Sequence, residues 1–354
     1  MRMGFRWFGA ADDPIPLAHI RQIPGVTQIV WALFDIPAGE SWPTGRIAAQ
    51  VAEIEAAGLR AEVVESVNVS DAIKIGQPER DRHIANYIDT IGNLSRSGVK
   101  VICYNFMPVF DWMRTDLRFR LVDGSAVLAY DSALIAPSAE EMLAQVQRGA
   151  DGFLLPGWEP ERLAQVRSLF EAYACVDEAK LADNFRYFIQ AVMPACEEYD
   201  VRMAVHPDDP PWPIFGLPRI VRNASDLRRI EAFHDSPYNA FTLCTGSLGE
   251  NPDNDVPAII REFAGRDKAP FIHARNIKHT SPGSFHEAAH LSKEGSLDMC
   301  EIMLAVAQTS PESYVRPDHG RDIWGERGRP GYGLHDRALG IAYLNGLWEA
   351  ITHG

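Results

Sequence analysis

Short β-type runs alternate with longer amphipathic runs along nearly the whole chain, and this alternation limits the possible folds most strongly. The runs predicted as strands cover residues 4–8, 26–34, 59–64, 99–104, 201–205, 241–243, 271–274 and 314–316. Predicted helices cover residues 17–22, 46–57, 78–97, 177–198, 225–233, 255–263, 298–307 and 336–351. Such alternation predicts a parallel sheet, and the count of eight strands favours a closed (β/α)8 TIM barrel. An open doubly wound sheet is the alternative, which the absence of G-x-G-x-x-G after the first predicted strand disfavours.

One region, residues 106–176, breaks the alternation. Asp123 and Gly124 indicate a hairpin turn within it, and residues 140–148 have a helical pattern. We interpret the region as an insertion after the fourth strand, above a single barrel domain that spans residues 1–354. The length of 354 residues suits that reading, because one α/β barrel takes roughly 200 to 400 residues.

The composition indicates a globular protein that does not bind nucleic acid or anionic membranes. Hydrophobic residues make up 46% of the chain, which allows a large core, and the formal net charge of -14 disfavours binding to nucleic acid or anionic membranes. The five cysteines are widely spaced, so no disulfide framework is expected. No apolar run approaches the roughly 20 residues that span a bilayer, and no signal-peptide pattern follows Arg2 and Arg6. A cytoplasmic protein is therefore expected.

The last four predicted strands end in residues that can bind a metal ion. His206 ends the fifth, Cys244 the sixth, His273 the seventh and Asp318 the eighth. In a (β/α)8 barrel these ends share the face that carries the active site. Two imidazoles with a carboxylate suit Mn²⁺, Fe²⁺ or Zn²⁺, whereas a thiolate favours zinc or iron. Each residue alone could be ordinary packing, but four at equivalent positions predict a divalent metal site.

Further polar residues follow the strand ends and are candidates for substrate binding. Asn105 and Trp112 come after the fourth predicted strand, and Arg275 and Asn276 come after the seventh. An arginine at the mouth of the barrel could bind a substrate carboxylate through two hydrogen bonds. The alternative for the arginine is an ordinary solvated surface charge.

The segment from His286 to His290 matches H-E-x-x-H, the helical zinc-protease pattern. That chemistry requires a stable helix, and Pro282 and Gly283 lie too close for one. The remaining readings are a helical turn in the loop after the seventh strand, or a lid that brings His286 or Glu287 to the substrate.

Seven segments along the chain carry a family resemblance. They are RWFG at 6–9, IPAGE at 36–40, VESV at 64–67, KVICYNFMPVFDW at 100–112, CTGSLG at 244–249, FHEAAH at 285–290 and RPDHG at 316–320. On these segments the chain resembles the mannonate dehydratase family over nearly its whole length.

The resemblance implies a xylose-isomerase-like barrel and a lyase that uses manganese or iron. The expected reaction is the dehydration of D-mannonate to 2-keto-3-deoxy-D-gluconate in hexuronate catabolism, by a homo-oligomer (dimer or tetramer). The resemblance further implies that the four strand-end residues bind the metal and that His319 and Tyr332 transfer protons. Two alternatives stay open: a metal-dependent sugar isomerase on the same barrel, and a sugar-acid binding protein with a structural zinc ion.

Overall fold

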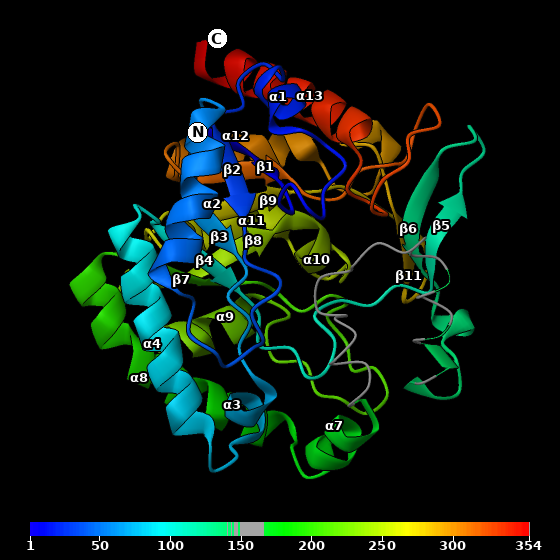
Figure 1. Cartoon of the computed structure of the whole chain (residues 1–354). Helices are drawn as coiled ribbons and strands as arrows, with labels where there is room; N and C mark the ends of the chain where they lie inside the picture. Colours follow the sequence, from blue (N-terminus) through cyan, green and yellow to red (C-terminus); the bar gives the residue numbers. More distant parts are fainter. Residues whose placement is uncertain (140, 143, 145–147, 149–165, 354) are drawn as a thin grey trace.

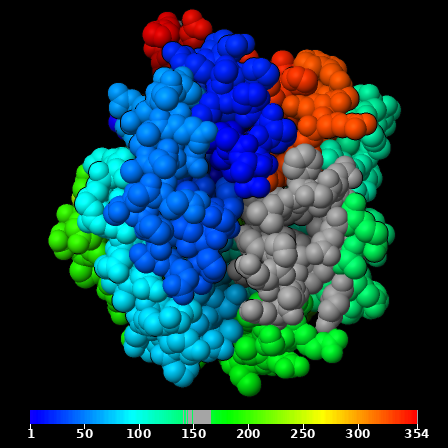
Figure 2. Space-filling view, in the orientation of Figure 1, coloured from blue at the N-terminus to red at the C-terminus, as the bar shows by residue number. Residues whose placement is uncertain are grey.

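The computed structural model describes residues 1–139, 141–142, 144, 148 and 166–353. Within these residues, eight parallel strands form a closed barrel (Figure 1). In order around the barrel they are β1 (Arg2–Arg6), β2 (Gln28–Trp31), β3 (Arg60–Glu65), β4 (Val101–Tyr104), β7 (Arg202–Val205), β8 (Asn239–Cys244), β9 (Phe271–Ala274) and β12 (Tyr314–Pro317). The last strand pairs with the first, with Met3 opposite Val315, so the predicted barrel is confirmed and the open sheet is wrong. Figure 2 shows the consequence at the surface, where blue N-terminal and orange C-terminal segments adjoin.

Helices surround this barrel (Figure 1). The described ones are α1 (Leu17–Arg21), α2 (Thr44–Ala56), α3 (Asp71–Ile75), α4 (Arg80–Arg96), α7 (Val166–Tyr173), α8 (Glu178–Tyr199), α9 (Ala224–Glu231), α10 (Thr245–Gly249), α11 (Val256–Ala264), α12 (Met299–Thr309) and α13 (Leu334–His353). Side-chain oxygens of Asp177, Asn223, Asp255 and Asp298 accept hydrogen bonds from the first-turn amides of α8, α9, α11 and α12. These caps fix where the helices start. No helix in the described ranges is both long and apolar enough to cross a membrane.

Among the residues that the structure describes, the buried apolar side chains form two clusters, one on each face of the barrel. The larger cluster joins the helices to strand residues such as Phe5, Ile29 and Val64. The smaller cluster contains Val30, Val63, Val101, Cys103, Ala204, Ala240, Phe271 and Tyr314. Successive strand residues point to opposite faces, so Phe271 shares the inner face with His273. The barrel interior is therefore packed with side chains, and polar groups are left at its C-terminal mouth.

A second, antiparallel sheet stands beside the mouth. Among the described residues it comprises β10 (Ile277–Ser281), β11 (Ser284–Glu287), β6 (Ala126–Tyr130) and β5 (Asp116–Arg120), in that order. The predicted turn at Asp123 and Gly124 is confirmed, because Gly124 has a φ of 86° and links β5 to β6. The 3-10 helix η1 (Ser132–Leu134) follows β6. The helix predicted at 140–148 lies mainly outside the described residues.

This sheet also corrects the reading of the H-E-x-x-H segment. His286 and Glu287 lie on β11, which pairs with β10 and β6, and not on a helical turn. Residues in a strand alternate between faces, so the two histidines cannot share one helical face as a zinc protease requires. The helical interpretation of this segment is wrong.

Candidate active site

The ends of β7, β8, β9 and β12 bring His206, Cys244, His273 and Asp318 together. One ligand atom from each lies within 4.8 Å of the others. The separations are 3.2 Å from His206 Nε2 to His273 Nδ1, 3.6 Å from Cys244 Sγ to Asp318 Oδ2, and 3.9 Å from His273 Nδ1 to Asp318 Oδ2. Four ligands bound tetrahedrally at 2.0–2.3 Å would lie roughly 3.3–3.8 Å apart. The four side chains therefore fit a single divalent metal ion.

Neighbouring groups orient the two imidazoles as metal binding requires. His206 Nδ1 lies 2.7 Å from the Pro207 carbonyl oxygen, so an Nδ1–H there donates and leaves Nε2 free. His273 Nε2 lies 3.3 Å from a Glu65 carboxylate oxygen, while Nδ1 faces the other ligands. Burial would raise the pKa of Glu65, but the Arg316 guanidinium and His273 outweigh it and hold that pKa well below its usual range. An ionised carboxylate behind a histidine is a frequent partner of metal-binding imidazoles.

Glu65, Cys103 and His273 form a second group with possible ligand spacing, but it suits a metal less well. Arg316 Nη2 already donates to Glu65 at 2.8 Å. Burial raises the pKa of the Cys103 thiol well above its ordinary value, and metals bind the thiolate. Asp318, in contrast, is ionised: burial opposes this, but His319 and Arg316 keep its pKa well below the usual range.

A cavity of about 70 Å³ opens beside these four side chains. It collects residues from loops far apart in the sequence, and most of the predicted site residues line it. Its lining includes Arg6, Glu65, Ser66, Cys103, Tyr104, Asn105, Met107, Asp111, Trp112, His206, Asp209, Arg275, Asp318, His319 and Tyr332.

His319 and Tyr332 lie in contact at this cavity. His319 Nε2 is 3.1 Å from the Tyr332 hydroxyl, and the two rings meet edge to face with centroids 5.0 Å apart. The connecting loop is closed by a hydrogen bond from the Gly320 amide to the Gly331 carbonyl at 2.8 Å. Burial raises the pKa of Tyr332, so its hydroxyl stays protonated at neutral pH. The Tyr332 hydroxyl can therefore donate one transferable proton across the contact to His319 Nε2.

Two predicted substrate-binding residues do not line the cavity. The Asn276 side-chain amide donates to the Leu291 carbonyl at 3.0 Å and accepts from the Leu297 amide at 3.1 Å. The His286 ring stacks on Phe119 with centroids 5.9 Å apart. Both side chains therefore serve local structure. Asn276 holds the loop that contains Leu291 and Leu297, and His286 packs against Phe119 within the second sheet.

A buried network of charges adjoins the cavity, and sequence reasoning missed two of its carboxylates, Asp209 and Glu250. Arg114 pairs with Asp209, and with Glu287 at 2.9 Å and Glu250 at 3.3 Å. Arg275 pairs with Asp209 at 3.0 Å and Glu250 at 2.7 Å. Burial holds the pKa of Glu250 well above its usual value, whereas the two arginines overcome burial and lower that of Asp209. Asp209 follows a strand end and could have been found; nothing in the local sequence marks Glu250.

Comparison with known proteins links this arrangement to one family. The family model described as D-mannonate dehydratase (UxuA) matches residues 1–354. A mannonate dehydratase of Lactococcus lactis subsp. lactis is 57% identical over 353 residues, which are 99% of each chain. One from Thermotoga maritima is 54% identical over 352 residues, covering 99% of this chain and 98% of the other.

Solved structures agree with the sequence comparison. The crystal structure of mannonate dehydratase from Streptococcus suis serotype 2 superimposes with a TM-score of 0.89 at 41% identity, covering 100% of this chain and 95% of the other. A xylose isomerase domain protein from Planctomyces limnophilus gives a TM-score of 0.56 at 11% identity, covering 99% of each chain. The second likeness shows the barrel fold alone.

Proposed function

The chain belongs to the D-mannonate dehydratase family, and from that premise we propose how the mouth of its barrel removes water from D-mannonate. The hydro-lyase reaction takes a proton from C2, next to the carboxylate, and expels the C3 hydroxyl to give 2-keto-3-deoxy-D-gluconate. One observation carries the proposal: four convergent metal-ligand atoms and a hydrogen-bonded histidine–tyrosine pair meet at a single cavity.

We assign Mn²⁺ or Fe²⁺ to the cluster of His206, Cys244, His273 and Asp318. When bound, the ion would stabilise the negative charge that develops on the substrate carboxylate and 2-oxygen as the C2 proton leaves. The protein supports this arrangement through Glu65, which lies behind His273.

His319 and Tyr332 perform the proton transfers. His319 Nε2 takes the C2 proton, and the Tyr332 hydroxyl gives its proton to the departing C3 hydroxyl, which leaves as water. The resulting enol rearranges to the 2-keto acid. The proton on His319 then returns to Tyr332 across their 3.1 Å contact, which restores the starting state. Because burial raises the pKa of Tyr332, its hydroxyl carries the proton that this step requires.

Two residues that line the cavity are assigned to binding the substrate, and a third is assigned to holding the groups that react with it. Asn105 and Trp112 contact the sugar acid, and Trp112 also covers His319 with ring centroids 6.1 Å apart. Arg275 Nη1 lies 3.3 Å from both Asp318 Oδ2 and His319 Nδ1. Since its guanidinium also binds Asp209 and Glu250, we assign Arg275 to holding these groups and not to a free grip on a carboxylate.

The decisive experiment is product analysis with D-mannonate after the purified protein is loaded with Mn²⁺ or Fe²⁺. We expect one 2-keto-3-deoxy acid per substrate consumed, and one solvent deuterium at C3 when the reaction runs in D₂O. An isomeric sugar acid without loss of water would instead identify an isomerase. Binding without turnover would identify a binding protein.

The protein is further proposed to be a cytoplasmic homo-oligomer, a dimer or tetramer. None of the five cysteines, all of which lie within the described ranges, forms a disulfide, which suits a reducing compartment. Large apolar side chains such as Val122 and Leu134 are exposed, and another subunit would cover them. Sedimentation velocity on the metal-loaded protein measures the mass directly, and a monomer at micromolar concentration would contradict this proposal.

A further inference from the structure

The glutamate of the H-E-x-x-H segment has a position that the metal site does not explain. Glu287 is fully buried at the end of β11, and its Oε1 lies 2.9 Å from Nδ1 of His319. The opposite ring nitrogen, Nε2, lies 3.1 Å from the Tyr332 hydroxyl. Carboxylate, imidazole and phenol thus form one hydrogen-bonded row that ends at the cavity.

We propose that Glu287 is a positioning residue for the dehydration: it accepts a hydrogen bond from Nδ1–H of His319 and so keeps Nε2 unprotonated toward the cavity. The inference rests on the proposed function, because it concerns the nitrogen that would take the C2 proton. A histidine can act as a base only through the nitrogen that lacks a proton, and the partner of the other nitrogen decides which one that is.

The competing tautomer is less favourable. Arg275 Nη1 also lies 3.3 Å from His319 Nδ1, and an arginine can only donate. That contact would require a bare Nδ1, with the proton on Nε2. The Glu287 contact is shorter, at 2.9 Å, and Arg275 Nη1 has a closer acceptor in Asp209 Oδ2 at 3.0 Å. A bare Nδ1 facing a carboxylate would place two acceptors in contact, so the proton belongs on Nδ1.

Charges around Glu287 support an ionised acceptor. Arg114 Nη2 donates to the same Oε1 at 2.9 Å, and Arg275 Nε lies 3.5 Å from Oε2. Burial would raise the pKa of Glu287, but Arg275 and His319 outweigh it and lower that pKa to about 2. Glu250 shares both arginines, yet burial raises its pKa well above the usual value. Of the two glutamates in the network, the one that touches His319 is therefore the ionised one.

The second sheet fixes this carboxylate in place. Glu287 pairs with Ile277 in the β10–β11 hairpin, and the next amide, of Ala288, donates to the Asn276 carbonyl at 3.0 Å. On the other side β11 pairs with β6 from the region after β4, where Phe285 lies opposite Tyr130. Both neighbours of β11 thus hold Glu287 against the barrel mouth, which gives the sheet a role in positioning His319.

The test compares Glu287→Gln with Glu250→Gln, which alters the same network without touching His319. We expect Glu287→Gln to lower kcat by about 10–10³-fold, less than or comparable to loss of the base itself, with KM and bound metal little changed. Glu250→Gln should keep kcat within about threefold. Both proteins are first checked for native thermal unfolding and metal content, so that a folding defect is recognised.

A spectroscopic readout separates orientation from mere structural support. In protein labelled with ¹⁵N-histidine and loaded with diamagnetic Zn²⁺, the His319 signals, assigned by their loss in His319→Asn, should show protonated Nδ1 and bare Nε2 in the wild type. Glu287→Gln should shift them toward the other tautomer, whereas Glu250→Gln should not. Unchanged signals in Glu287→Gln, or equal losses of kcat in both variants, would overturn the inference. If the wild type fails to dehydrate D-mannonate, the proposed function is wrong. The ¹⁵N signals of His319 would still show whether Glu287 sets its tautomer.

Discussion

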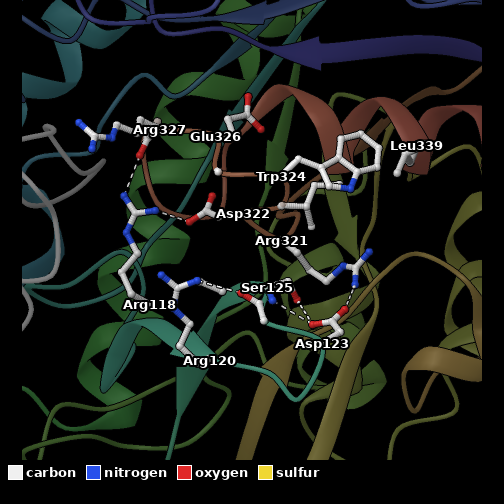
Figure 3. A pocket seen from close by; sticks show the side chains of 15 residues that line it. Arg118, Arg120, Asp123, Ser125, Arg321, Asp322, Trp324, Glu326, Arg327 and Leu339 are labelled. Atoms are coloured by element: carbon white, nitrogen blue, oxygen red, sulfur yellow. Dashed lines mark hydrogen bonds and ion pairs between the residues drawn. The ribbon is translucent and has the colours of Figure 1, made fainter.

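The cavity at the barrel mouth and a cleft on the surface beside it are hollows of opposite character. The cavity at the mouth has a volume of about 70 Å³, and its charged residues are almost all buried. The outer cleft measures about 1000 Å³ and lies between the β5–β6 turn and residues 321–328 (Figure 3). In the outer cleft Arg321 pairs with Asp123 at 3.1 Å, and Arg118 pairs with Asp322 (Figure 3).

The burial of charge, and not the volume, indicates which of the two hollows carries out chemistry. Arg114 and Arg275 at the mouth are removed from water, which costs several kcal/mol per ion unless partners are well placed. Such an arrangement shifts pKa values and holds reacting groups in fixed orientations. Partly exposed pairs such as Arg321 with Asp123 contribute about 0–1 kcal/mol and impose little order. We therefore assign the chemistry to the smaller hollow and propose that the outer cleft supports its walls.

The largest effect should come from removing a carboxylate at the mouth. Asp318→Ala should reduce bound metal and lower turnover by at least about 10³-fold, because the charge that stabilises the reacting substrate is lost with the ion. Elemental analysis and 2-keto acid formation measure the two losses. Asp123→Ala removes a carboxylate from the outer cleft and should change neither. A metal-loaded, active Asp318→Ala protein would remove Asp318 from the site.

Two buried histidines that both appeared in metal-binding patterns should behave differently. His273→Ala should lower metal affinity by more than about tenfold. Losing even a residue that only hydrogen-bonds to a metal ligand usually lowers the affinity by about this factor. His290 packs its ring close to Gly340 of α13, and burial lowers its pKa. His290→Ala should therefore keep its metal while losing thermal stability. Equal metal loss in both variants would show that the wrong histidine was assigned.

Substitution of the proton-transfer pair should leave the metal in place. His319→Asn and Tyr332→Phe should each lower kcat by about 10²–10⁴-fold, the usual contribution of a general acid or base. Metal content and binding of D-mannonate should persist, because neither side chain is an assigned ligand. Isothermal titration with D-mannonate, beside the turnover assay, measures both properties. Full turnover by His319→Asn would exclude His319 from the mechanism.

The sequence predicted the barrel and the convergence of four possible metal ligands, because both follow from local patterns. Strands buried on both faces are short apolar runs, and parallel strands end at one mouth, so His206 and Asp318 could be placed together without coordinates. The strand boundaries were less accurate. The run predicted over residues 26–34 extends past the end of β2 at Trp31, because Phe34 packs on the core after the strand has ended.

The second sheet could not be predicted in the same way. β11 is four residues long, and its partner β6 lies about 150 residues earlier, so no local period reveals the pairing. Its H-E-x-x-H spacing is typical of a helix, which gave the wrong local structure. Glu250 is significant only through contacts with Arg114 and Arg275, which distant loops supply. These features depend on tertiary contacts, as does the row from Glu287 to Tyr332.

The smallest effects should arise in the outer cleft. Arg118 Nη2 donates to the Gly328 carbonyl at 2.9 Å, its Nη1 pairs with Asp322, and Asp322 also pairs by its backbone with Ala126. These contacts tie β5 and β6 to the loop that connects His319 to Tyr332. Losing a charged hydrogen bond of about 1.5–3 kcal/mol should loosen this loop, so Arg118→Ala should lower kcat/KM by roughly tenfold with metal content unchanged.

The matched control is Trp324→Ala on the same loop. Trp324 is 75% exposed, and its ring lies 5.5 Å from that of His335, so its removal should change kcat/KM by less than about twofold. Steady-state kinetics with D-mannonate on both variants decides the matter. If Trp324→Ala were the more damaging change, the outer cleft would itself bind a molecule that matters for turnover. The contrast between a reacting mouth and a supporting cleft would then be wrong.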